Sequence, residues 1–242
     1  MQWIGTALTD MPPRLAIVAA MEREVAPLLS RWRRREAPEA PGGPARRLVF
    51  FESDAGVLVI GGIGSKAAGR AARLALELGP IDVLVSAGSA GALRLEWRVG
   101  QVLRPTTVID AATGARFASQ GDGGTLVTTD DILGPETKKE AAARFTADAV
   151  DMEAAAVAAV AQEKGIGFLA VKAISDELDS VMPPMNRFVS AEGGFQTTRF
   201  VGFLTIRPWW WGAVRRLARD SKRAAHALCE TLEKLEADVK CA

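Results

Sequence analysis

Residues 14–32, "RLAIVAAMEREVAPLLSRW", place a short apolar run directly before an amphipathic one. The first half is apolar and contains β-branched residues, which is typical of a buried strand. In the second half apolar residues recur three and four positions apart, as on one face of a helix: Val25, Leu28, Leu29 and Trp32. The stretch therefore predicts a strand that runs straight into a helix. Glu22 and Glu24 fall in the first helical turn, where the helix dipole favours negative charge.

The next segments repeat this alternation. Residues 34–47, "RREAPEAPGGPARR", are rich in Pro and Gly and predict a flexible loop. Residues 48–64 contain two strand-like runs, "LVFFES" and "VLVIGGIG", on either side of a short turn, which predicts a hairpin. "SKAAGRAARLALELG" (65–79) predicts a helix, and "IDVLVSAGSAGAL" (81–93) predicts a strand that breaks into a loop of small residues.

The same pattern continues to residue 176. "VGQVLRPTTVID" (99–110) is typical of one or two strands, and "PETKKEAAARF" (135–145) has the composition of a helix. "DMEAAAVAAVAQEKG" (151–165) predicts a buried helix, and "GIGFLAVKAISD" (165–176) predicts a buried strand that leads into an acidic loop. Strands that are apolar throughout and alternate with helices are typical of a sheet covered on both faces.

The fold class that follows is α/β, as a three-layer αβα sandwich with helices on both sides of a central mixed sheet. A chain of 242 residues is long enough to bury one large core. We expect a single domain over residues 14–242. Residues 1–13 are expected to be a disordered extension, with Met11 as the natural start.

The composition argues against several classes of partner and of catalytic chemistry. Thirty basic and 29 acidic residues give a net charge of +1, whereas nucleic-acid binding would want a basic excess. Two cysteines and a first apolar run too short for a signal peptide or a spanning helix favour the cytoplasm. One histidine, His226, and no tyrosine argue against a Ser-His-Asp triad, a Cys-His pair or a metal cluster. We therefore expect no metal and no cofactor, and carboxylates must carry any proton transfers.

Carboxylates and small residues stand where such folds bind ligands, at the carboxyl ends of strands. Five features fall there: Met21–Glu24, Gly61–Ser65, Ala87–Gly91, Asp151–Glu153 and Ile174–Asp176. Glu153 heads an alanine-rich helix, where an ionised group costs several kcal/mol unless it is paired or used. Asp176 follows a buried run, which predicts a desolvated carboxyl that keeps a proton to donate. Each feature also has a structural alternative: first-turn acids, tight turns or an N-cap. "GGIGS" lacks the third glycine of a dinucleotide fingerprint, since Ala67 stands there.

Taken together, these stretches resemble the nucleoside phosphorylase and nucleosidase superfamily, and most of all its 5′-methylthioadenosine/S-adenosylhomocysteine nucleosidase branch. The resemblance covers roughly Leu15 to Asp179 and rests on "IVAAMEREVAPLL", "GGIGSKAAGRAA", "VSAGSAGAL", "DMEAAAVAAVA" and "VKAISDELD", in that order. The combination of "MEREV", "GSAG", "ME" before an alanine helix and "ISD" is highly specific, although each piece alone is weak.

The resemblance implies roles for the carboxylates. Glu153 would bind the ribose hydroxyls and stabilise positive charge on the sugar, and Asp176 would protonate N7 of the departing purine. Glu24, helped by Ser89, would position and deprotonate the attacking water. Breaking an N-glycosidic bond gives an oxocarbenium-like sugar, so an acid at the base, negative charge near the sugar and a nucleophile suit this chemistry.

The resemblance also implies the walls of the substrate site. Met152 would pack on the ribose face, Met21 would line the sugar pocket, and Gly64 and Leu133 would complete the substrate contacts. Ile132 falls near the position of the aromatic residue that stacks on adenine in the nucleosidase branch. An aliphatic platform there weakens the expectation that the base is adenine.

One departure concerns the nucleophile. Phosphorolytic members use arginines to bind phosphate, one of them just before the Gly-Ser of the central loop. Here that stretch is Leu84, Val85, Ser86 and Ala87, which favours water over phosphate. Arg70 and Arg73, on the helix at 65–79, are the arginines that a phosphate site would have to use.

The chain departs from the methylthioadenosine branch over residues 180–242. Between Arg199 and Arg223 there are seven basic residues and one acid, interleaved with Phe, Trp, Leu and Val. Such a segment suggests a membrane interface or a site for an apolar substrate tail; the alternative is a core-packing or dimer-forming helix with a solvated basic face. "RFVSAEGGFQTTRFVGFLTIRPW" (187–209) resembles a hopanoid-associated subgroup, thought to remove adenine from adenosylhopane.

The sequence therefore predicts hydrolytic cleavage of a purine nucleoside, with adenine as the base and adenosylhopane as the leading substrate. We expect a cytoplasmic homodimer with peripheral membrane contact through residues 199–223 and no nucleic-acid partner. Three alternatives fit the same residues: a phosphate-dependent phosphorylase, a methylthioadenosine/S-adenosylhomocysteine or futalosine-type nucleosidase, and a non-catalytic, membrane-associated nucleoside-binding protein.

Overall fold

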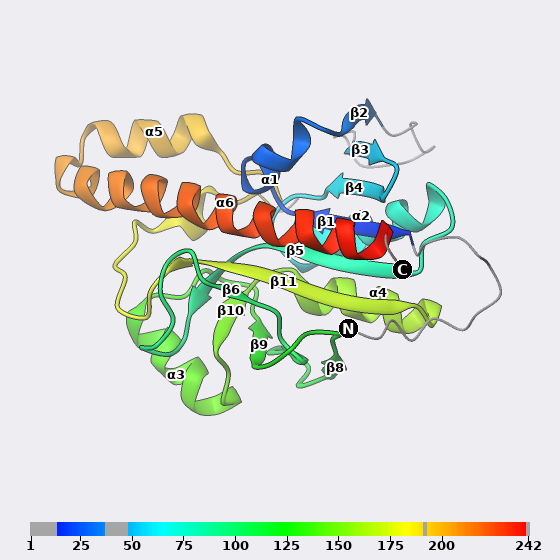
Figure 1. Ribbon diagram of the computed structural model, residues 1–242. Helices are drawn as coiled ribbons and strands as arrows, with labels where there is room; N and C mark the ends of the chain where they lie inside the picture. The colour runs from blue at the N-terminus through cyan, green and yellow to red at the C-terminus, as the bar shows by residue number, and fades with distance from the viewer. Residues whose placement is uncertain (1–13, 37–47, 191–192, 241–242) are drawn as a thin grey trace.

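One mixed sheet organises the computed structural model, which describes residues 14–36, 48–190 and 193–240 (Figure 1). The extension expected at residues 1–13 lies outside these ranges. The strands are Leu15–Ala19 (β1), Arg33–Glu36 (β2), Val49–Ser53 (β3), Gly56–Ile60 (β4), Val83–Ala92 (β5), Val102–Leu103 (β6), Thr107–Asp110 (β7), Arg116–Ala118 (β8), Thr125–Thr128 (β9), Ala149–Asp151 (β10) and Gly167–Asp176 (β11). Their order is β2-β3-β4-β1-β5-β10-β9-β7-β8, and β11 pairs with β5 and β6 beside this path.

Helices cover both faces of the sheet. They are Glu22–Leu29 (α1), Ser65–Glu77 (α2), Pro135–Phe145 (α3), Ala154–Lys164 (α4), Thr197–Thr205 (α5) and Trp211–Lys240 (α6), with short 3-10 helices at Met185–Phe188 (η1) and Pro208–Trp210 (η2). Strand β1 shows why two faces are needed. Ala16 and Val18 join the core that contains α2 and α4, whereas Leu15, Ile17 and Ala19 join the core that contains α1 and α6. The αβα sandwich predicted from the alternation of elements is confirmed.

The small-residue segment that the sequence assigned to a loop is instead the continuation of β5. Residues Ala87 to Ala90 pair in parallel with β11, and the last residues of β5 pair antiparallel with β10. The ladder on β11 compensates for the weak strand propensity of these residues. The glycines lie where charged side chains cross the strand. A Cβ on Gly91 would lie 2.9 Å from Asp176 Oδ2, closer than a normal contact, whereas one on Gly88 would be in ordinary contact with Glu24 Oε1 at 3.5 Å.

A second correction concerns the start of the loop predicted at residues 34–47. Residues 33–36 form β2, which pairs antiparallel with β3. An ion pair between Arg35 Nε and Glu52 Oε2, at 3.2 Å, adds to this edge pairing. The rest of the predicted loop, residues 37–47, lies outside the described residues.

The C-terminal segment has two parts with different environments. The second half of α6 packs on the sheet, where Leu228, Leu232 and Val239 are buried. The first part of α6, together with α5 and η2, extends beyond the edge of the sheet (Figure 1). We call residues 195–222 the arm. The described part of the chain has no helix of sufficient length and apolarity to cross a membrane.

Candidate active site

A cavity of about 680 Å³ opens where the carboxyl ends of β1, β5, β10 and β11 meet. Its walls include eight of the nine residues that the sequence assigned to a site: Met21, Glu24, Ser89, Ile132, Leu133, Met152, Glu153 and Asp176. The ninth, Gly64, is not among the lining residues, but its backbone N–H donates to Glu153 Oε1 at 2.9 Å. Residues as far apart in the sequence as Met21 and Asp176 are therefore brought to one cavity.

Glu24 is held by the backbone of two elements. The N–H of Ser89 in β5 donates to its Oε1 at 3.0 Å, and the N–H of Met21 donates to its Oε2 at 3.1 Å. The residue is buried, although it stands in the first turn of α1. A first-turn acid placed only for the helix dipole would lie in solvent, so the burial of Glu24 at the cavity indicates a role in the site.

Glu153 occupies the N-cap position of α4 and forms part of the cavity wall. Besides Gly64, its carboxylate accepts a hydrogen bond from the N–H of Met152 at 3.3 Å. Burial raises the pKa of Glu153 to about 7. The positive charge of Lys172 and the bond from Gly64 oppose this rise, and the negative charges of Asp151 and Glu24 add to it. Glu153 therefore changes charge near neutral pH.

Lys172, in the middle of β11, is a site residue that the sequence analysis missed. Its side chain is buried, and its Nζ lies 2.8 Å from Asp151 Oδ2. Burial alone would lower the pKa of Lys172, but the carboxylates of Asp151, Glu153 and Glu24 outweigh it and raise the pKa. The lysine is thus a fixed cation among three carboxylates. The available signal was a charged residue within the apolar run "FLAVKAIS".

Asp151 anchors this arrangement to α4. Its Oδ1 accepts a hydrogen bond from Thr128 Oγ1 at 2.6 Å, and its Oδ2 accepts one from the N–H of Ala154 at 2.8 Å. The second bond satisfies a free N–H in the first turn of the helix. Asp151 and Lys172 therefore fix the start of α4, and with it the backbone from which Glu153 projects.

Asp176, at the end of β11, was predicted to be a desolvated carboxyl that keeps a proton, and in the structure it has two side-chain partners. Its Oδ1 accepts a hydrogen bond from Ser175 Oγ at 2.8 Å, and its Oδ2 forms an ion pair with Lys138 of α3. The side chain of Lys138 is 1% exposed and that of Asp176 is 11% exposed. Lys138 was missed because it stands in "PETKKEAAARF", where lysines are typical of a solvated helix face.

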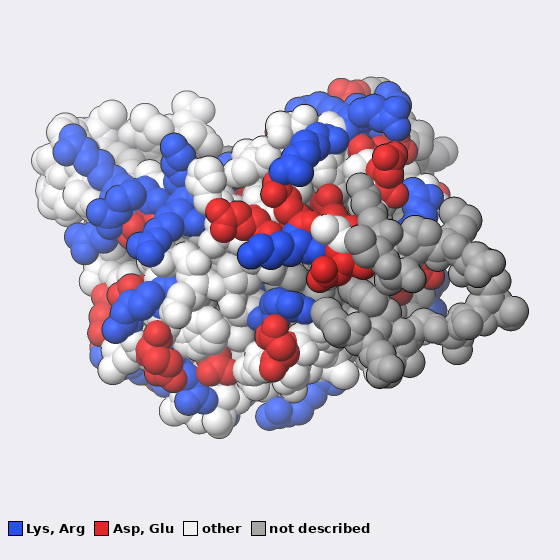
Figure 2. Space-filling model, viewed as in Figure 1, with Lys and Arg blue, Asp and Glu red and all other residues white. Residues whose placement is uncertain are grey.

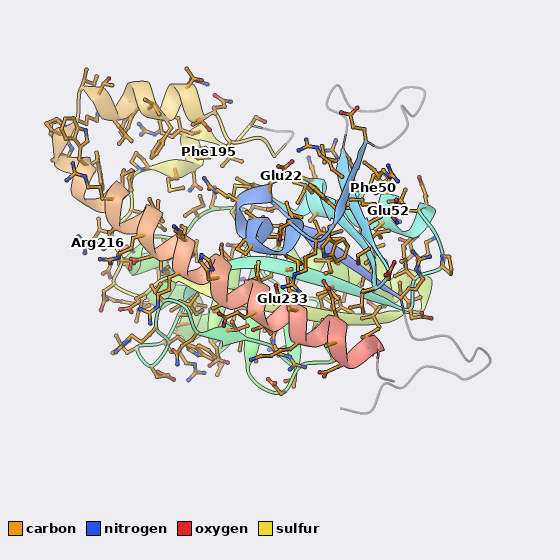
Figure 3. The ribbon with its side chains drawn as sticks, turned by 45° about the horizontal axis from the view of Figure 1, so that its top comes forward. Glu22, Phe50, Glu52, Phe195, Arg216 and Glu233 are labelled. Atoms are coloured by element: carbon orange, nitrogen blue, oxygen red, sulfur yellow. The ribbon has the colours of Figure 1, made fainter. Side chains whose placement is uncertain are left out.

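The cavity continues from the carboxylates toward the arm. This branch is walled by Met182, Met185, Phe195, Phe200, Val214 and Leu217. Phe195 lies just before α5 (Figure 3), and the guanidinium of Arg23 in α1 is 5.8 Å from its ring centroid. The segment is tied to the loop before α3, because the N–H of Ile132 donates to Asn186 Oδ1 at 2.8 Å. The branch is therefore a built, apolar extension of the site.

The arginines considered for phosphate lie elsewhere. Neither Arg70 nor Arg73 is among the residues that line the cavity. Arg73 bonds to Glu163 of α4 at 2.8 Å, on the outer surface. The basic residues that do line the cavity are Arg23, Lys138, Lys222 and His226. Within the described ranges, no group of three or more His, Cys, Asp or Glu side chains is placed to hold a metal ion.

Comparison with known proteins agrees with this architecture. Residues 14–123 and 111–193 match the family described as the phosphorylase superfamily. No curated protein matches the chain.

Solved structures share the fold at low sequence identity. A mutant of Helicobacter pylori 5′-methylthioadenosine/S-adenosylhomocysteine nucleosidase, with 5′-methylthioadenosine in its active site, is 16% identical, with a TM-score of 0.68 over 94% of this chain and 99% of that one. Arabidopsis thaliana 5′-methylthioadenosine nucleosidase is 17% identical (TM-score 0.69; 95% and 97% covered). Futalosine hydrolase of Helicobacter pylori is 14% identical (TM-score 0.64; 93% and 100% covered).

Proposed function

The chain belongs to the phosphorylase superfamily, and on that premise we propose that it hydrolyses the N-glycosidic bond of a purine nucleoside. The observation that carries the proposal is the convergence of Glu24, Glu153 and Asp176 on one cavity. Each comes from a different element, and each is held by hydrogen bonds from neighbouring groups. Three oriented carboxylates can serve three parts of one cleavage without histidine or metal.

The proposed mechanism assigns one part of the bond cleavage to each carboxylate. The bonding pair between C1′ and N9 leaves with the purine, which gains a proton at N7 from the Asp176 end of the cavity. Positive charge then develops on the sugar, where ionised Glu153 stabilises it. Water adds to C1′ and gives up a proton to Glu24, which the backbone of Ser89 holds in place.

Water is favoured as the nucleophile by the charge around it. Glu24 and Glu153 are both acidic, and the nearby cation Lys172 is already paired with Asp151 at 2.8 Å. A phosphate dianion would be repelled by the carboxylate of Glu24 and by the ionised form of Glu153. Arg23 and Lys222 line the outer cavity, so phosphorolysis is the second candidate, and phosphate dependence distinguishes the two.

We propose that the substrate carries a large apolar group at its 5′ position, with adenosylhopane as the leading candidate and adenine as the base. The support is the branch of the cavity toward the arm, with walls of Met, Phe, Leu and Val. Burial of apolar surface contributes about 25 cal/mol per Å², so a hydrocarbon tail in this branch adds substantially to binding. Ile132 lines the cavity and would give the base an aliphatic surface, which does not itself favour adenine over another purine.

Base release measures both proposals together. Free base from adenosylhopane, 5′-methylthioadenosine, adenosine and inosine, each with and without phosphate, would be quantified by chromatography. We expect adenine without phosphate, and a kcat/KM for the lipid-tailed substrate at least about tenfold above that for 5′-methylthioadenosine. Strict dependence on phosphate would establish a phosphorylase. Equal kcat/KM values for all adenine nucleosides would overturn the proposal of a large apolar 5′ group. No base release from any substrate would favour a binding protein.

We further propose a cytoplasmic protein that binds the inner face of the membrane through the arm. The exposed large apolar side chains of the described residues are Leu95, Val181, Val201, Ile206, Trp209 and Trp211. The last four belong to the arm, and the first two line a surface pocket with Trp209. Lys and Arg side chains gather over the first part of α6, below the mostly uncharged surface at the upper left, where α5 lies (Figure 2). Apolar rings beside basic groups suit an anionic lipid surface.

Co-sedimentation with vesicles of phosphatidylglycerol and phosphatidylcholine tests this contact. We expect binding by the unmodified protein and a loss of about tenfold or more in Trp209→Ser/Trp211→Ser, because both rings are exposed on the arm. Arg33→Ser/Arg34→Ser, on the exposed strand β2, is the matched control for nonspecific charge and should keep its binding. Equal binding by both variants would overturn the proposal. The homodimer expected from the resemblance stays a prediction for analytical ultracentrifugation.

A further inference from the structure

Lys138 reaches the cavity wall from α3 and makes three contacts with one short segment of chain. Its Nζ pairs with Asp176 Oδ2 and donates to the carbonyl of Glu177 at 2.8 Å and to that of Asp176 at 3.5 Å. The side chain is 1% exposed and also lines the cavity. An ammonium is therefore buried at the site of base protonation, with acceptors for all three of its N–H groups.

The backbone around the pair is shaped to admit it. A Cβ on Gly91 would lie 3.0 Å from Lys138 Cε and 2.9 Å from Asp176 Oδ2, so a larger residue at this point of β5 would displace the pair. Buried ion pairs contribute little to stability, because the free-energy cost of removing two charges from water is about as large as the attraction between them. A buried pair that faces a reaction cavity suggests a use in the chemistry instead.

We propose that Lys138 is the proton source for the departing purine, with Asp176 as the relay between them. This inference rests on the proposed function. In the free protein Asp176 already accepts a hydrogen bond on each oxygen, from Ser175 Oγ and from Lys138. Of these two donors the ammonium of Lys138 is the stronger acid, so it is the one that can give up a proton through Asp176.

The step balances without any further reactant. As the C1′–N9 bond breaks, its electron pair moves into the purine and N7 becomes basic. One N–H bond of Lys138 breaks, its proton passes to the Asp176 carboxylate, and the carboxyl gives a proton to N7. Lys138 is left as a neutral amine and Asp176 as a carboxylate. Solvent returns the proton to Lys138 once the base has left.

Other charged groups face the pair from the elements around it. From the loop before α3 comes Asp131, and from the loop after β11 comes Glu177, whose Oε1 lies 4.0 Å from Arg98 Nε. The remaining titratable groups that line the same cavity are Glu24, Asp151, Glu153, Arg23, Lys222 and His226. Because Glu153 titrates near neutral pH, variants are compared with the unmodified protein at each pH, so that its contribution cancels.

Two substitutions of Lys138 distinguish a residue that donates a proton from one that only supplies positive charge. Arginine keeps the positive charge but does not release a proton, so Lys138→Arg should lower kcat for purine nucleosides by about 10²- to 10⁴-fold at every pH. Lys138→Met removes the cation, and burial then favours a neutral Asp176 that holds its own proton in acid. Its kcat, divided by that of the unmodified protein, should rise steadily from pH 8 to pH 5.

A nitrophenyl riboside and a neighbouring lysine provide the controls. Nitrophenolate leaves without a proton, so both Lys138 variants should cleave this riboside within about threefold of the unmodified protein, which also reports a folded site. Lys139 is exposed and paired with Glu136 at 2.9 Å, so Lys139→Met should turn over purine nucleosides normally.

The outcomes distinguish the relay from the proposed function. Turnover of purine nucleosides by Lys138→Arg at the rate of the unmodified protein would overturn the relay alone. So would a Lys138→Met ratio that does not change with pH, which is the result expected of a structural lysine. No base release by the unmodified protein would overturn the proposed function and the relay together.

Discussion

The Glu153→Gln variant is expected to lose about 10²- to 10³-fold in kcat and yet to be more stable than the unmodified protein above neutral pH. The loss of activity follows because an amide cannot supply the negative charge that stabilises an oxocarbenium-like sugar. The gain in stability follows because burial opposes the ionised form of Glu153 and raises its pKa to about 7. An amide oxygen can still accept the hydrogen bond from Gly64.

The pH dependence of this gain has a defined sign. Between the ordinary pKa of 4.5 and the folded-state value of about 7, the folded protein holds a proton that the unfolded chain has lost. Stability therefore falls as pH rises through this window, and the cost is fully present above it. It amounts to about 3 kcal/mol. Urea unfolding at pH 4.5 and pH 8 should show the variant gaining stability only at pH 8; a variant that is less stable at pH 8 would contradict the argument.

Asp176→Asn should lower kcat by about 10²- to 10⁴-fold while nucleoside binding is kept, because the amide cannot relay a proton to N7. Unlike Glu153→Gln, it should also destabilise the protein, by roughly 3 kcal/mol. The reason is that the buried ammonium of Lys138 loses its counter-charge and keeps mainly backbone carbonyls as partners. Turnover, equilibrium binding of a nucleoside and urea unfolding at pH 8 measure the three quantities.

The double variant Asp176→Asn/Lys138→Met is the control for this interpretation. Removing both charges removes the unpaired ammonium, so most of the lost stability should return while kcat stays low. If the double variant were as unstable as Asp176→Asn, the cost would lie in packing and not in the unpaired charge. If Asp176→Asn turned over nucleosides at the normal rate, Asp176 would have no part in the proton transfer.

The elements and carboxylates that the sequence predicted are those whose signals are local. The strand-to-helix pattern at residues 14–32 depends on adjacent residues, and Glu24, Glu153 and Asp176 each stand at the end of an element that its own neighbours define. Their convergence follows from the rule that such ends share one edge of the sheet. Their roles came from the resemblance.

What the sequence could not predict depends on partners far along the chain. Lys138 pairs with a residue 38 positions away, and in isolation it is typical of a surface lysine. Lys172 likewise finds its counter-charge on another strand. The strand character of Gly88 to Gly91 depends on pairing with β11, which local propensity does not record. In each case tertiary contacts outweigh the local signal.

Helix α6 has a consequence for the size of the group that the proposed substrate can carry. A helix of 30 residues is about 45 Å long, and here its two ends have different surroundings. Leu228 and Leu232 clamp one end into the core, while Val214 and Leu217, at the other end, form part of the outer wall of the cavity. Because both ends belong to one continuous rod, that wall stands at a set distance from the carboxylates. Under the proposed function, the fixed length of α6 would then limit the length of the group attached to the sugar, and no movement of the arm would be needed.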